Sequence, residues 1–172
     1  MSFIQRDPVP REPSTSSGVT GANDKYDIVI NGANIAHRYY EAVHPERGRG
    51  FDWKGIKVAL DYYIERGAHP VAVVKDCTLQ NCRIPTRYRR DHIIAVPSRD
   101  NLGKDGDDLF SLRVAMEHNC YILDNDNYRD WTDRLKGKDD RLQEWFERTK
   151  TTFHICTFHL YYSKDSNFDM AS

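Results

Sequence analysis

Short apolar runs recur along the chain from residue 26 onward, and each ends in polar or small residues. The runs cover residues 26–30, 70–74, 92–96, 121–123 and 152–158. Runs of this length that are apolar at nearly every position are typical of strands covered on both faces. They predict a mostly parallel central sheet of about five strands.

Between these runs lie segments whose apolar residues recur every three or four positions, as on one face of an amphipathic helix. The clearest stripe falls in residues 52–66: Ile56, Ala59, Leu60, Tyr63 and Ile64. Asp52 is placed to cap the start of this helix and Gly67 to end it. Similar spacing predicts helices over about residues 107–118 and 139–148.

Apolar strands that alternate with helices predict an α/β fold in which helices cover both faces of the sheet. Residues 1–24 are rich in Pro, Ser and Thr and nearly lack large apolar residues. Such a segment buries too little surface to offset its ordering entropy, so a disordered tail or linker is expected there. The folded domain is expected over residues 25–165, with a tail at 166–172.

The size and charge of the chain add little to this prediction of the fold and restrict the possible functions only slightly. The chain has 172 residues, of which 39% are hydrophobic, enough for one domain with a real core. Its net charge of −1 gives no overall sign of a nucleic-acid binder. We find no secretory leader or membrane span in the sequence and expect an intracellular, cytoplasmic protein with no membrane partner, in RNA granules among other places.

The chain has four cysteines, namely Cys77, Cys82, Cys120 and Cys156. They lack the spacing of a zinc site, and two of them lie in apolar, strand-like runs. Free and largely buried thiols are therefore expected rather than structural zinc.

Polar residues gather where the predicted strands end, which is where open α/β sheets bind their ligands. They are Asn31, Asn34, Arg99, Asp100, Asp124, Asp126 and Asp130, while Asp107 and Asp108 open the helix before the fourth strand. Any one of them alone is explained by helix capping or turn chemistry.

Together, however, several carboxylates repel one another unless a cation neutralises them. Asp126 and Asp130 are four residues apart, so a helical turn would place them on one side. Oxygen ligands of this kind suit Mg²⁺ or Mn²⁺, which can activate a water for phosphodiester hydrolysis.

The order of short motifs over residues 26–160 closely resembles that of the Regnase/MCPIP-like NYN ribonucleases, a PIN-like branch. The motifs are Asn31-Gly-Ala-Asn34, Lys54-Gly-Ile-Lys, Glu65-Arg-Gly67, Val96-Pro-Ser-Arg99, Asp107-Asp108 and Asn125-Asp-Asn-Tyr-Arg-Asp130. The resemblance implies a PIN-like three-layer α/β/α sandwich. It also implies metal-dependent endonucleolytic cleavage of RNA, mostly single-stranded, in RNA decay or RNA silencing.

Carried over position by position, the resemblance implies catalytic roles for Asn31, Asp107, Asp108, Asp126 and Asp130. Within this set, Asn31, Asp108, Asp126 and Asp130 would hold the Mg²⁺ or Mn²⁺ ion. Asn31 stands where the family has its strand-one aspartate, and it keeps the shape and one acceptor oxygen but not the charge. Even losses beyond the direct ligands cost about 10–100-fold in affinity or activity, so at least that loss is expected here.

Two explanations of Asn31 stay open. We favour an introduced, inactivating substitution, because the other four acids are intact. The alternative is a natural pseudonuclease that binds RNA or a protein without cutting. The chain also lacks the Cys-x3-His-type zinc finger and the Asp-Pro-Leu-Gly-Arg tail of the family, which indicates a diverged branch.

Basic residues are the candidates for RNA contact. The resemblance places Lys54, Arg99 and Lys104 near the family's RNA groove, and Arg83, Arg87, Arg89 and Arg90 cluster around Tyr88. Arginine suits phosphate, and Tyr88 could stack a base, although a solvated surface explains the cluster equally well. Single-stranded RNA is the expected partner, its binding weakening with salt. A homodimer, or a protein partner in an RNA-processing complex, is also open.

Other classes of function fit the sequence less well. The seven histidines are scattered without a pairing pattern, which disfavours histidine acid–base catalysis. A phosphohydrolase of small molecules would need a nucleophilic aspartate after the first strand, and Asn31-Gly-Ala does not supply it. A dinucleotide-binding protein would need a Gly-x-Gly-x-x-Gly motif there.

Overall fold

The computed structural model describes residues 25–80, 82–98, 106–126, 128 and 130–149. Within these ranges the chain forms one four-stranded sheet of entirely parallel strands, in the order β3-β2-β1-β4. The strands are β1 (Ile28–Asn31), β2 (Pro70–Lys75), β3 (Ile93–Val96) and β4 (Tyr121–Leu123). The fifth strand predicted over 152–158 and both predicted tails lie outside the described residues.

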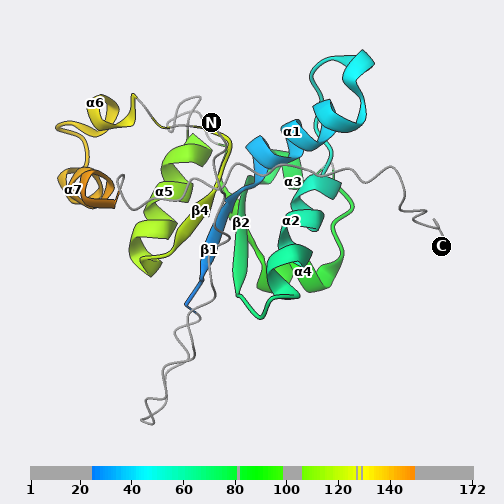
Figure 1. The fold of residues 1–172 in the computed structure, drawn as a ribbon, viewed down its shortest axis with the longest axis horizontal. Coiled ribbons are helices and arrows are strands. Elements are labelled where there is room, and N and C mark those ends of the chain that lie inside the picture. Colours follow the sequence, from blue (N-terminus) through cyan, green and yellow to red (C-terminus); the bar gives the residue numbers. More distant parts are fainter. Residues whose placement is uncertain (1–24, 81, 99–105, 127, 129, 150–172) are drawn as a thin grey trace, which may run out of the picture.

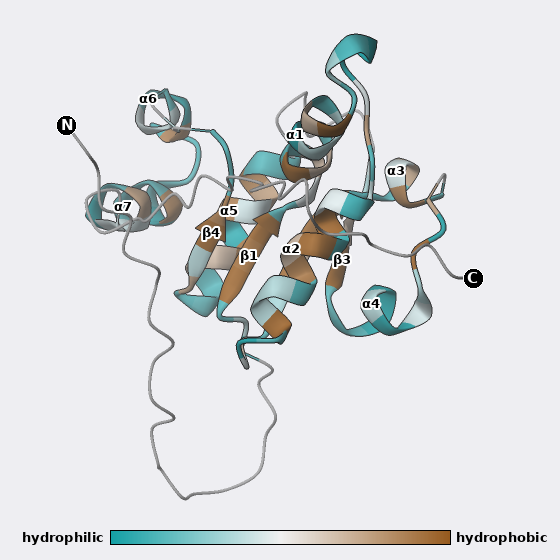
Figure 2. Cartoon of the chain, turned by 45° about the vertical axis from the view of Figure 1, so that its right-hand side comes forward, coloured by the Kyte–Doolittle hydropathy of each residue, from teal (hydrophilic) through white to brown (hydrophobic). Residues whose placement is uncertain are grey.

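Helices cover both faces of this sheet (Figure 1). On one side are α1 (Gly32–Val43), α2 (Lys54–Ile64), α3 (Asp76–Gln80) and α4 (Thr86–Asp91), with a short 3₁₀ turn at Pro45–Arg47. On the other side are α5 (Gly106–His118), α6 (Trp131–Leu135) and α7 (Asp140–Thr149). Hydrophobic residues concentrate in the strands, whereas α4 and α7 carry many hydrophilic ones (Figure 2).

Alternation along the strands divides the core into two halves, because successive side chains point to opposite faces. Ile28 and Ile30 of β1 pack in the half formed with α1 and α2. Val29, between them, packs in the half formed with α5 and α7. The predicted α/β/α sandwich with a parallel sheet is therefore confirmed, with four strands in the described residues.

The first helix differs from the prediction. Small and polar residues follow strand one and no helix was predicted there, but α1 begins directly at Gly32, with Asn31 as its N-cap. The close approach of α1 to β2 explains the glycine, since a Cβ at Gly32 would lie 2.5 Å from Val74 Cγ2 and 2.8 Å from the Val73 carbonyl oxygen.

The C-terminal end of α2 is as predicted, whereas at the N-terminal end the N-cap residue is Trp53 and Asp52 lies just before it. The Asp52 carboxylate accepts a hydrogen bond from the Lys54 backbone N–H at 2.9 Å. Gly67 follows the helix with a φ of +75°, a left-handed conformation that favours glycine. None of the helices in the described part of the chain is long and apolar enough to cross a membrane.

Candidate active site

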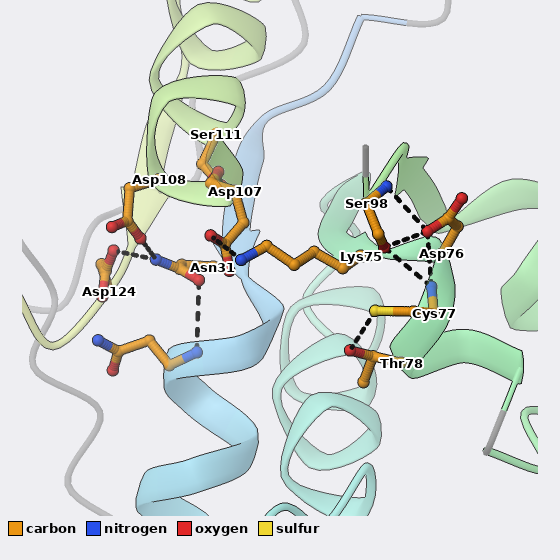
Figure 3. A network of polar contacts seen from close by, with 11 residues as sticks. Asn31, Lys75, Asp76, Cys77, Thr78, Ser98, Asp107, Asp108, Ser111 and Asp124 are labelled. Carbon is orange, nitrogen blue, oxygen red and sulfur yellow. Dashed lines mark hydrogen bonds and ion pairs between the residues drawn. The ribbon is translucent and has the colours of Figure 1, made fainter. Parts of the chain in front are cut away.

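The candidate site lies where the strands end, and strand alternation decides which side chains enter it. Asn31 and Lys75 are the last residues of β1 and β2. Their side chains point to the same face of the sheet as those of Val29 and Val73, two residues earlier in each strand, which pack on the α5 side. The first turn of α5 carries Asp107 and Asp108. Two strand ends and one helix start therefore meet above the same face (Figure 3).

Asn31 makes side-chain hydrogen bonds to several of the residues at this site. Its side-chain Nδ2 donates to Asp108 Oδ1 at 2.8 Å and to Asp124 Oδ2 at 2.7 Å. Its Oδ1 accepts from the backbone N–H of Asn34 at 3.3 Å and so caps α1. Because carboxylates only accept, the nitrogen of the amide must face them, and the side chain uses both of its ends.

Asp124, the first residue after β4, is fully buried beneath the site. Besides Asn31 it accepts hydrogen bonds from the Tyr128 hydroxyl and from the backbone N–H groups of Asn125 and Asp126, the last two at 2.6 and 3.1 Å. Burial raises the pKa of Asp124, and these hydrogen bonds offset only part of that effect. The sequence placed Asp124 after strand four but gave no reason to rank it with the catalytic acids.

Lys75 is a second site residue that sequence reasoning missed. Its Nζ lies 3.1 Å from Asp107 Oδ1, and both side chains are largely buried, 30% and 11% exposed. Figure 3 shows Lys75 extending from the end of β2 to Asp107 alongside Asn31. A lysine at the end of an apolar strand is not part of any sequence motif considered above. Its ion pair with Asp107 becomes evident only once β1 and β2 are known to be neighbouring strands.

The other two acids are placed differently from the prediction. Asp126 Oδ1 accepts from the Tyr128 backbone N–H at 3.2 Å, and α6 begins only after Asp130. Tyr128 between them has a φ of +51°, so no helical turn stacks Asp126 on Asp130, and that prediction is wrong. Burial and Asp124 raise the pKa of Tyr128 well above its usual value, and the carboxylates of Asp108 and Asp126 raise it further. Asp126 thus lies next to Tyr128 and Asp124 through backbone hydrogen bonds, while Asp130 is exposed at the start of α6.

A divalent cation does not fit these residues as they stand. Two carboxylates, of Asp108 and Asp124, face one point, and that point is filled by the Asn31 nitrogen, whose N–H groups cannot ligate a metal. In the ranges that the structure describes, no three His, Cys, Asp or Glu side chains group closely enough to hold a metal ion.

The comparisons with known proteins identify the fold around this site. Residues 24–166 match the family model described as the Zc3h12a-like ribonuclease NYN domain. The chain belongs to this family. It is also similar to the Endoribonuclease rege-1 of Caenorhabditis elegans, with 30% identity over 141 residues, which is 70% of this chain and 20% of that protein. The NYN domain thus spans about a fifth of the length of that relative.

The predicted RNA-binding residues of the NYN domain are only partly brought together. Lys54 is exposed at the start of α2, near the edge where the strands end. Arg90 forms a two-fold hydrogen bond with Asp91, whose carboxylate lies near His69 and His92, the residues just before β2 and β3. Arg90 is therefore at the opposite edge of the sheet. Arg99 and Lys104 lie outside the described residues.

Tyr88 is not available to stack a base. It is 2% exposed, and its hydroxyl donates to Asp61 of α2. The guanidinium of Arg87 packs over the Tyr88 ring, 4.7 Å from its centroid, while Arg89 is exposed to solvent. The idea of base stacking by this tyrosine is wrong because the ring fixes α4 onto α2.

Three histidines that are scattered in sequence meet in the structure, but away from the acids. The rings of His69, His92 and His118 form a row with Tyr26, with centroids 4.6 to 5.6 Å apart. These residues precede β1, β2 and β3 or end α5, so they lie at the edge where the strands begin.

Proposed function

We propose that this NYN domain is an RNA-binding domain of the endoribonuclease type whose cleavage of single-stranded RNA is impaired by Asn31. Family membership supports the substrate class and the type of reaction. The contacts of Asn31 support the impairment, because its amide directs N–H groups at Asp108 and Asp124.

Asparagine and aspartate at position 31 would give the site different chemistry. An aspartate would keep the cap on α1 with one oxygen and turn a second, charged oxygen toward Asp108. With Asp108, Asp126 and Asp130 it would restore the acidic set that the family resemblance implies. A bound Mg²⁺ or Mn²⁺ would supply an activated water for hydrolysis and stabilise the charge that develops on the phosphate. Asparagine instead joins the acids through hydrogen bonds and needs no cation.

The experiment compares the chain with its Asn31→Asp variant on a 5′-labelled, unstructured RNA. We expect both proteins to bind the RNA in EDTA, because binding rests on basic side chains such as Lys54 and not on the acids. We expect only the variant to cleave appreciably when Mn²⁺ is added, and EDTA to abolish that cleavage. Loss of cleavage in Asn31→Asp/Asp108→Asn would show that the activity belongs to this site.

A second candidate function is a non-catalytic RNA- or protein-binding scaffold in an RNA-processing complex. The observation that favours it is the same one, namely that the acids are held together by the chain's own donors. An Asn31→Asp variant that binds RNA in EDTA but stays inert with Mn²⁺ on several RNAs would favour the scaffold and contradict the nuclease proposal.

A further inference from the structure

Three carboxylates crowd one end of the sheet and must be neutralised there. Asp107 is 8% exposed and Asp124 is fully buried, and Asp108 shares a hydrogen-bond donor with Asp124. Buried carboxylates are stable in the charged form only when they are paired with a cation or with good donors. The groups that pair with these three carboxylates therefore determine how the site is held together.

The chain supplies the pairing from two strand ends. The Asn31 amide joins Asp108 to Asp124, at 2.8 and 2.7 Å, and the Lys75 ammonium lies 3.1 Å from Asp107. Asp107 and Asp108 are consecutive residues in the first turn of α5. The two donors thus reach the same helix start from neighbouring strands, one bringing N–H groups and the other a positive charge (Figure 3).

We propose that Lys75 and Asn31 together take the place of a divalent cation, so that this site is assembled without metal. This inference rests on the proposed function only in taking the acids as a former or potential metal site. Lys75 supplies one positive charge beside Asp107, and Asn31 supplies the bridge between Asp108 and Asp124. Each also opposes a bound cation, Lys75 by charge repulsion and Asn31 by directing hydrogens at the position that the metal would occupy.

Substitutions at the two positions distinguish this proposal from the simple loss of one metal ligand. If Asn31 only removed a ligand, then Asn31→Asp alone would restore full cation binding. If Lys75 also replaces the cation's charge, then Asn31→Asp restores it partly, and Lys75→Met must be added for the full effect. The interaction between the two substitutions is therefore the quantity to measure.

The test is a thermal-unfolding titration with MnCl₂ on the whole chain and three variants: Asn31→Asp, Lys75→Met, and the two combined. Each protein's melting temperature is referred to its own value in EDTA, so that destabilisation by a substitution does not enter. We expect no shift for the unsubstituted chain and the largest for the double variant, about 3–6 °C at roughly ten times its Kd. Calorimetric titration of Mn²⁺ should give the same order of affinities.

Matched controls separate charge at the site from charge in general. Asn119→Asp, in the exposed turn after α5, and Lys138→Met, in the exposed turn before α7, change the net charge identically. Their combination should leave the Mn²⁺ response of the chain unchanged.

Two results would overturn the proposal. One is a melting temperature of the unsubstituted chain that rises with Mn²⁺ as much as that of the double variant. The other is a double variant that responds no more than Asn31→Asp alone. RNA binding and cleavage do not enter this readout, so a failure of the proposed function would be seen separately, as absent RNA binding or as a double variant that binds Mn²⁺ without cleaving RNA.

Discussion

At the scale of single residues, Asn31 has both a structural role in the fold and a chemical role in the site. Its oxygen caps α1 and its nitrogen bridges two acids, one on α5 and one after β4. A residue with a single kind of polar atom can fill only one of these roles well. The choice between amide and carboxylate at this position therefore changes the chemistry of the site and leaves the helix start in place.

The cysteines give a prediction at the same scale. Burial, with a contribution from Asp27, raises the pKa of the Cys120 thiol to about 12, whereas Cys77 is exposed. Because the thiolate is the reactive species, Cys120 should resist iodoacetamide at pH 8 in the folded protein, while Cys77 reacts. Peptide mass spectrometry before and after unfolding in urea measures this. Equal labelling of Cys77 and Cys120 in the folded protein would contradict the burial of Cys120. None of the three cysteines in the described residues forms a disulfide, but Cys77 is exposed and Cys82 and Cys120 are only partly buried, so the prediction of largely buried thiols is wrong for Cys77.

At the scale of elements, α4 is fixed onto α2 by one buried tyrosine. The Tyr88 hydroxyl donates to Asp61, which also pairs with Lys57 at 2.5 Å. Burial raises the pKa of Asp61, but the hydrogen bonds from Lys57 and Tyr88 outweigh it and hold that pKa below its usual value. A short helix of six residues gains its position from such contacts and not from its own propensity.

We expect Tyr88→Phe to lower the free energy of unfolding by about 1–2 kcal/mol at pH 7, the range for a hydrogen bond to a charged group that is partly exposed. The folded state depresses the pKa of Asp61, so this stabilisation is present above the unfolded-state pKa and is lost as pH falls through the folded-state value. Urea unfolding at pH 7 and near pH 3 measures both effects. A difference between the two proteins that grows on acidification would contradict the assigned partner.

The same scale shows how much the sequence could predict. The β-strands were predictable because nearly every position is apolar, and α2, α5 and α7 because each shows helical spacing or a capping signal over ten residues or more. The twelve residues of α1 were missed because the small residues after strand one resemble a turn. The helices α3, α4 and α6 have five or six residues, too few for a periodic pattern. The pairing of Lys75 with Asp107 depends on the strand order, which no local pattern encodes. Asn31 and the acids of the family motif were predictable, whereas the contact of Asp124 with Asn31 and the role of Lys75 were not.

At the scale of the whole molecule, a net charge of −1 means that RNA binding must come from local basic groups. Lys54 is exposed near the strand ends, whereas the charge of Arg90 is neutralised by Asp91 at the opposite edge. We therefore expect the two residues to make different contributions to RNA binding, although both are basic and exposed.

We expect the affinity for single-stranded RNA to fall with salt, and Lys54→Met to weaken it and to reduce the slope of log K against log salt by about 0.7. Arg90→Met should change the slope least. Fluorescence anisotropy in EDTA over a salt series measures both. A larger loss of affinity for Arg90→Met than for Lys54→Met would show that RNA binds at the edge where the strands begin, and would contradict this prediction.

We propose above all that Asn31 separates the ribonuclease fold from ribonuclease activity. Its most direct test is the single-turnover rate constant for cleavage of one unstructured RNA, at saturating protein and Mn²⁺, for the chain and for Asn31→Asp. We expect the rate constant of the variant to be higher by at least about 10–100-fold. Equal rates for the two proteins, whether both are active or both are inert, would contradict it.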